Sequence, residues 1–212
     1  MPVIVERLEM RRRTLVVIAA LASLSQPKPA LAAGSGNQFL ATVLGGLGRQ
    51  GEWFACFSQQ YDDAHLAAHP GQRVTFMKAL VDGYFRTSVL GPASGSYMYQ
   101  VSLAFRFRDR TDTLTGVAEC GDGKPKDSVR GGANCAGPGD ASHLAMAGRQ
   151  VLVVTIPNGA DLWGPGPKDE RHDTIKNPFG PDDRVFRLTR TDVRQCEDLA
   201  FDRQKPLRPH EP

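Results

Sequence analysis

The sequence has no apolar stretch long enough to cross a membrane. Its longest apolar run, around residues 15–22, covers about ten residues, whereas a membrane-spanning helix needs roughly 20. No segment repeats along the chain, which excludes propellers and solenoids. The remaining expectation is one globular domain, because the chain beyond its first 32 residues is long enough to bury a core.

Familiar catalytic signatures are also missing. Ser94 lies in Gly-Pro-Ala-Ser-Gly-Ser, which lacks the Gly-x-Ser-x-Gly spacing of a nucleophile elbow. The glycine-rich stretch 130–139 has no Lys-Ser/Thr pair, so it is not a P-loop. No Cys-x-x-Cys pair is present, which argues against a four-cysteine metal site.

An excess of basic charge is absent once the N-terminal segment is set aside. The whole chain has 26 basic and 23 acidic side chains. Residues 1–32 hold five of the basic and two of the acidic side chains. The rest of the chain therefore has 21 of each sign. A neutral domain lacks the basic surface of a nucleic-acid-binding protein, so we expect no nucleic-acid partner.

The N-terminal segment has the layout of an export signal. A basic cluster at 11–13 precedes the apolar run 15–22, and small residues follow at 30–32. A membrane anchor or a buried helix is the competing interpretation. We predict a signal peptide over 1–32, a single domain over 33–200 and a flexible tail over 201–212, with the protein periplasmic or secreted and free of a membrane span after cleavage.

The four cysteines fit that compartment. All of them follow residue 32, and an even number after an export signal predicts two disulfides. Of the three possible pairings we favour Cys120–Cys135, because a glycine- and proline-rich loop separates these residues. That choice leaves Cys56–Cys196, which would tie the start of the domain to its end.

Alternating hydrophobicity indicates a mainly β fold. Over residues 97–108 aromatic and aliphatic side chains occupy every second position, as expected of a strand with one buried face. Residues 61–69 suggest one short helix, 39–44 a strand or a mobile segment, and 157–184 a long irregular loop. We predict an antiparallel sandwich or small barrel with one short helix, stapled by two disulfides.

Two histidines near that helix form a candidate metal site. If residues 62–69 are helical, His65 and His69 lie one turn apart and Asp62 joins the same face. Two imidazoles and a carboxylate could bind zinc or another transition metal, although further ligands would be needed. The alternative is structural: Asp62 and His65 bond to the backbone and His69 closes the helix before Pro70.

The same segment carries a resemblance. A cysteine followed by Tyr-Asp-x-x-His-Leu-Ala-x-His-Pro-x-Gln-x-Val-Thr, here spanning residues 56–75, resembles a group of uncharacterised exported bacterial proteins. They end in a Phe-Arg-Leu strand followed by a cysteine, as at residues 186–188 and Cys196. The resemblance implies no activity and no catalytic residues. It supports the Cys56–Cys196 pairing, since both cysteines fall within the matching segments.

Aromatic residues complete the candidate sites. Trp163 lies in a Gly-Pro-rich loop and could stack on a sugar or anchor a partner, or it could cover one end of the sheet. Tyr61, beside the two histidines, is a second candidate binding residue. We predict an exported, non-catalytic domain without a cofactor that binds a protein, glycan or envelope component. The alternative is a metal-binding protein or metal-dependent enzyme that uses Asp62, His65 and His69.

Overall fold

A computed structural model describes residues 35–46, 51–88, 91–121, 133–137, 139–164, 173–200 and 207. All of them belong to one unit, Ala33–Pro212. The predicted export signal over 1–32 lies outside the described residues. Among the helices that are described, none combines the length and apolar character needed to span a membrane.

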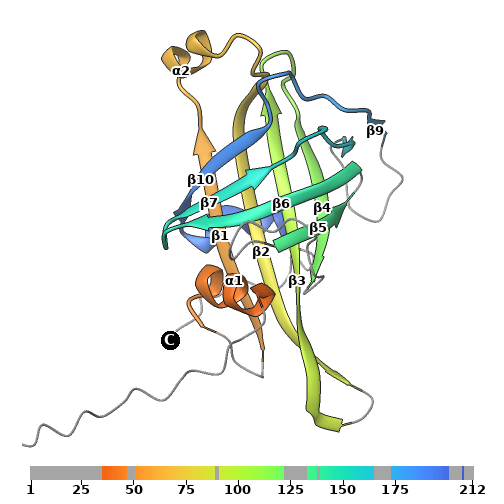
Figure 1. The fold of residues 1–212 in the computed structure, drawn as a ribbon. Helices are drawn as coiled ribbons and strands as arrows, with labels where there is room; N and C mark the ends of the chain where they lie inside the picture. The colour runs from red at the N-terminus through yellow and green to blue at the C-terminus, as the bar shows by residue number, and fades with distance from the viewer. Residues whose placement is uncertain are drawn as a thin grey trace, which may run out of the picture. The chain divides into compact units, whose positions relative to one another are not determined.

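Strands dominate the described part of the chain (Figure 1). There are also two α-helices and one 3-10 helix: α1 (Ser35–Leu44), α2 (Asp63–Ala68) and η1 (Val193–Leu199). The strands are β1 (Glu52–Gln60), β2 (Val74–Ser88), β3 (Gly91–Phe107), β4 (Thr113–Gly121), β5 (Ala133–Gly137), β6 (Gly139–Ala147), β7 (Val151–Thr155), β8 (Leu162–Trp163), β9 (Thr174–Ile175) and β10 (Val185–Thr191).

The strands form one antiparallel sheet that closes on itself. Its order is β3-β2-β1-β10-β7-β6-β5-β4-β8-β9, and β3 also pairs with β4. Eight strands, β1 to β7 and β10, therefore form a ring in which each is paired with both neighbours, while β8 and β9 extend from β4. The prediction of a mainly β, antiparallel fold is confirmed. Of the two predicted alternatives, an antiparallel sandwich and a small barrel, the strand pairing shows the small barrel. We call this barrel the closed sheet.

The alternation that predicted a strand at 97–108 places one set of side chains inside the closed sheet. Tyr99, Val101 and Phe105 are at most 2% exposed, whereas Arg106 on the opposite face is exposed. Inside the closed sheet the rings of Phe105 and Phe179 meet edge-on, with centroids 5.1 Å apart. Eight strands enclose a space that side chains can just fill, and here they fill it.

Helix α1 contradicts the expectation of a strand or mobile segment at residues 39–44. Its apolar residues recur at helical spacing, so Phe39, Leu40, Val43 and Leu44 share a buried face. That face packs at one end of the closed sheet (Figure 1). Gly83 on β2 permits the close approach, because a Cβ there would lie 2.6 Å from a methyl group of Leu44. The prediction of only one short helix is therefore wrong.

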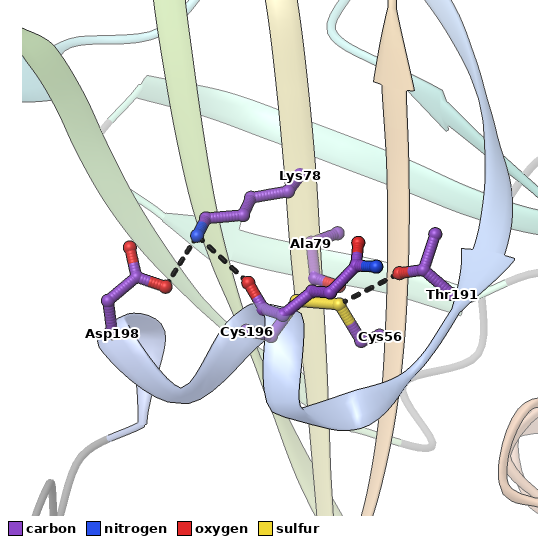
Figure 2. A network of polar contacts seen from close by, with 7 residues as sticks. Cys56, Lys78, Ala79, Thr191, Cys196 and Asp198 are labelled. Atoms are coloured by element: carbon purple, nitrogen blue, oxygen red, sulfur yellow. Dashed lines mark hydrogen bonds and ion pairs between the residues drawn. A yellow bond between two sulfur atoms is a disulfide. The ribbon is translucent and has the colours of Figure 1, made fainter.

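The two predicted disulfides, Cys120–Cys135 and Cys56–Cys196, are both present, and no described cysteine is free. Cys120 and Cys135 face each other in register across β4 and β5. Cys56 lies on the outer face of β1 and is bonded to Cys196 on η1, as Figure 2 shows. This second bond crosses from the first strand to the helix that follows the last strand.

Helix η1 covers a second apolar cluster on the outside of the closed sheet. The cluster includes Leu80 on β2, Leu199 on η1 and Leu207. The Lys78 ammonium also donates to the carbonyl of Gln195, at 3.0 Å, and holds η1 from the sheet side (Figure 2). The predicted flexible tail over 201–212 lies outside the described residues apart from Leu207, which is 5% exposed.

Candidate functional site

The short helix α2 is held in place at both of its ends. Six residues do not form a stable helix alone, so tertiary contacts must supply the stability. At the N-terminus the Asp62 carboxylate accepts from the backbone N–H of His65 at 2.7 Å, as an N-cap does. At the C-terminus the Arg108 guanidinium donates to the carbonyls of Leu66 and His69, at 2.6 and 3.1 Å. The predicted helix in this segment is confirmed.

A buried carboxylate joins the loop after α2 to the turn before β10. Asp183 is 0% exposed and accepts from the backbone N–H groups of Arg73, Val74 and Gly180, at 2.9, 3.2 and 2.8 Å. A carboxylate tolerates full burial when several donors replace its water. The neighbouring Asp182 accepts from the N–H of Gly71 at 3.0 Å. Segments more than one hundred residues apart in sequence are thus fixed side by side.

Three rings are stacked along this end of the molecule. The ring centroids of Tyr61 and His65 are 4.7 Å apart, and those of His65 and His69 are 4.3 Å apart. The interplanar angles are 28° and 24°. Tyr61 packs against the interior core, whereas His69 is exposed. The stack therefore runs from the core to solvent.

Hydrogen bonds select one tautomer for each imidazole. Gln72 is 5% exposed, and its amide nitrogen donates to the carbonyl of Val74 at 2.8 Å. Its amide oxygen is then the partner of His65 Nε2 at 3.0 Å, so that Nε2 carries the proton. His69 Nδ1 lies 2.9 Å from the carbonyl of His65 and must donate to it. When neutral, each ring keeps its other nitrogen as an acceptor.

This geometry does not bring Asp62, His65 and His69 together as metal ligands. Nowhere in the described residues do three or more His, Cys, Asp or Glu side chains form a group that could hold a metal ion. The Asp62 carboxylate is used as a helix cap, and the stacked rings place the two imidazoles face to face. Asp62 bonds to the backbone and His69 caps the C-terminus of α2, as the structural alternative expected, whereas the His65 side chain bonds to the side chain of Gln72 and not to the backbone.

An open cleft of about 540 Å³ lies beside α2, and we call it the α2 cleft. Its cations, Arg184 and Arg187, are exposed and make no ion pair with a carboxylate within the described part of the chain. Val185 between them is 54% exposed and adds an apolar contact surface. The lining residues are Gln59, Gln60, Tyr61, Asp62, His65, His69, Gln72, Asp182, Arg184, Val185 and Arg187.

The interior of the closed sheet offers little room by comparison. A gap bordered by Leu103, Ser142 and Ile156 measures about 20 Å³, which is close to the volume that one water molecule requires. The inward-facing aromatic and aliphatic side chains occupy the remaining space. Of these two spaces, only the α2 cleft has room for a ligand of several atoms.

Trp163, the other predicted binding residue, is not brought together with Tyr61. It lies on β8, pairs with Thr115 of β4 and is half-buried. It does not line the α2 cleft. Of the acidic residues near it in the sequence, Asp169 and Glu170 lie outside the described residues, and Asp161 is paired with Lys176 at 2.7 Å.

Several lining residues were not identified from the sequence. Arg184 and Arg187 enter the α2 cleft from β10 and the turn before it. The alternation along β10 carried a signal for Arg187, because it assigned that side chain to the outer face. No comparable pattern in the sequence marked Gln72 or Asp183, since their hydrogen-bond partners are brought to them only by folding.

Alkaline titration should detect the ionisation of Tyr61. Burial, with the nearby charge of Asp183 as a smaller cause, raises the pKa of Tyr61 from its usual 10.0 to about 12. Between these values the unfolded chain has lost the proton and the folded chain keeps it, so stability falls as pH rises through this window. We expect Tyr61 to ionise late in an absorbance titration at alkaline pH.

The matched variants are Tyr61→Phe and Tyr84→Phe. Tyr61→Phe should remove the late-ionising group, and Tyr84→Phe should leave it in place because Tyr84 is 39% exposed. If Tyr61→Phe removes a group that ionises in the ordinary range, the assignment is wrong.

No family model, no curated protein and no solved structure matches the chain.

Proposed function

We propose that this protein is an exported, non-catalytic binding domain that holds a glycan of the cell envelope in the α2 cleft. The observation that carries the proposal is the composition of that cleft. Amide, imidazole and guanidinium groups line it together with a ring stack and one exposed apolar side chain. Sugars present hydroxyl groups that donate and accept hydrogen bonds, and such mixed surfaces are suited to them.

Preorganisation supports binding at this place. His65 and His69 are each fixed by a hydrogen bond and by stacking, and Gln72 is buried beneath them. A site whose side chains are already ordered loses less conformational entropy when a ligand arrives. The carboxylates at the cleft, Asp62 and Asp182, accept from backbone N–H groups. Their structural role favours binding over acid–base chemistry.

The two disulfides support the export part of the proposal. Disulfides persist in oxidising compartments such as the periplasm and the extracellular space. Both bonds here are buried, and each joins elements of the closed sheet or its covering helix. A scaffold of this kind with a cleft at one end is typical of domains that position binding residues on loops.

Calorimetric titration with neutral, amino-sugar and uronic-acid oligosaccharides tests the proposal. We expect at least one class to bind, and His69→Ala to weaken it by about fivefold or more, the loss that follows when a contact worth over 1 kcal/mol is removed. His143→Ala is the control, because His143 is exposed on β6 and does not line the α2 cleft. Absence of binding by all three classes, or equal affinity of both variants, would contradict the proposal.

The metal-binding alternative has its own test. We expect elemental analysis of metal-replete, desalted protein to find no stoichiometric transition metal, with no change in His65→Ala. That variant should instead lose about 1–2 kcal/mol of stability, because it leaves the buried Gln72 oxygen without its donor. One metal ion per chain that disappears in His65→Ala would establish the alternative.

A further inference from the structure

A second open cleft lies beside α1, at the opposite end of the closed sheet from α2 (Figure 1). We call it the α1 cleft, and its volume is about 600 Å³. Arg149, Arg190, Gln38 and Gln150 line it, together with Thr42 and small or apolar residues of α1. No carboxylate is among its described lining residues. Its charge is therefore positive, in contrast to the α2 cleft, where two aspartates accompany two arginines.

Arg190 is the fixed element of the α1 cleft. It pairs with Phe57 across β1 and β10, and its guanidinium lies 4.7 Å from the centroid of the Phe57 ring. Its Nη2 donates to the carbonyl of Val43 near the end of α1, at 2.5 Å. Its Nε donates to the carbonyl of Arg149 at 3.4 Å. These contacts hold the guanidinium plane in one orientation.

All of these contacts are with neutral groups. Arg190 is half-buried, and burial lowers the pKa of its guanidinium. No described carboxylate forms an ion pair with it. Two carbonyl groups and an aromatic ring replace part of the water that this cation has lost, but they do not neutralise its charge. An anion that enters the α1 cleft would supply the missing charge.

Arg149 is the second arginine that lines the α1 cleft. It lies in the turn that joins β6 to β7, and its own carbonyl is one of the acceptors of Arg190. The backbone of Arg149 is thereby held next to the guanidinium of Arg190. The Arg149 side chain is exposed, so it can move to a ligand without breaking a contact of the core. Two guanidinium groups are well matched to carboxylate and phosphate oxygens.

We propose that the α1 cleft binds a small oxyanion, a phosphate or carboxylate group, through Arg190 and Arg149. The site is separate from the α2 cleft and does not depend on the glycan proposal. Arg190 provides a fixed, partly desolvated charge, and Arg149 closes over the ligand from the solvent side. The side-chain amides of Gln38 and Gln150 add neutral donors around it.

Titration of the oxidised protein with inorganic phosphate and, separately, with citrate at low ionic strength tests this site. We expect the wild type to bind at least one probe, and Arg149→Gln to weaken that binding by about tenfold, as loss of a charged hydrogen-bond partner does. Arg86→Gln, an exposed arginine on β2, is the matched control and should bind as the wild type does. Tighter binding of phosphate would indicate a phosphate site, and tighter binding of citrate would indicate a carboxylate site.

A second variant keeps the test independent of folding. Arg190→Lys retains the charge and loses the planar fork, so it should stay folded by near-ultraviolet circular dichroism and bind more weakly. If neither probe binds the wild type, or if Arg149→Gln and Arg86→Gln bind equally, the proposal is overturned. If Arg190→Lys is folded and binds as the wild type does, the assignment of Arg190 is overturned.

Discussion

Replacement of Asp183 by alanine should lower the free energy of unfolding by about 3–5 kcal/mol, because it would leave three buried backbone N–H groups without an acceptor. The side chain is 0% exposed and accepts from Arg73, Val74 and Gly180. Urea denaturation of the wild type and the variant, followed by fluorescence, measures the difference.

Asp182→Ala is the matched control for this prediction. Asp182 is adjacent in sequence, exposed, and accepts from one backbone N–H, that of Gly71. Its loss should cost about 0.5–1.5 kcal/mol, the net contribution of an ordinary hydrogen bond. If Asp183→Ala costs no more than Asp182→Ala, the carboxylate does not hold the α2 cleft together.

Removal of the Cys56–Cys196 disulfide should have a similarly large effect. The bond closes a loop with a sequence separation of 140 residues, and restriction of the unfolded chain by such a loop is worth about 5 kcal/mol. The Cys120–Cys135 bond closes a separation of 15 residues, for which the same reasoning gives about 3 kcal/mol. Guanidinium denaturation of the two double-alanine variants should therefore place Cys56→Ala/Cys196→Ala lower in stability.

The elements joined by the two disulfides differ in the contacts that would remain without the bond. Without the bond, η1 would retain the Lys78 contacts and its part of the outer apolar cluster, but it would no longer be tied covalently to β1. Cys120 and Cys135 would remain paired through the backbone of β4 and β5. Equal losses from the two double variants, or a larger loss from Cys120→Ala/Cys135→Ala, would show that loop closure is not the main contribution.

Local patterns explain what could be predicted from the sequence. The alternation in β3 is a property of consecutive residues, and it predicted both the strand and its buried face. The helix at residues 61–69 was predicted because that segment is rich in Ala and Leu and ends at Pro70. The pairing of Cys120 with Cys135 followed from the glycine- and proline-rich loop between them, and that of Cys56 with Cys196 followed by elimination.

Distant contacts explain what could not be predicted. Closure of the sheet depends on the pairing of β1 with β10, strands more than one hundred residues apart. Helix α1 was mistaken for a strand or mobile segment because residues 39–44 are a short apolar run, and its helical face is selected by packing against the closed sheet. Asp182 and Arg184 reach the α2 cleft through the folded turn before β10, and Arg187 reaches it from β10 itself.

The filled interior and the open clefts have different roles in this fold. Inward-facing aromatic and aliphatic residues of the closed sheet supply stability, with α1 packed at one end. The polar residues that could recognise a ligand are gathered at the α2 and α1 clefts. Substitutions at His69 or Arg149, both exposed, should therefore change binding with little effect on stability.

Chemical-shift mapping of the ¹⁵N-labelled protein during titration with the oligosaccharide that binds in calorimetry tests the central claim most directly. The account predicts that the shifted backbone amides cluster at residues 59–72 and 182–187, around the α2 cleft, while those of Phe105 and Leu152 in the interior stay unchanged. Shifts centred on Trp163, or on the inward-facing residues of the closed sheet, would contradict it.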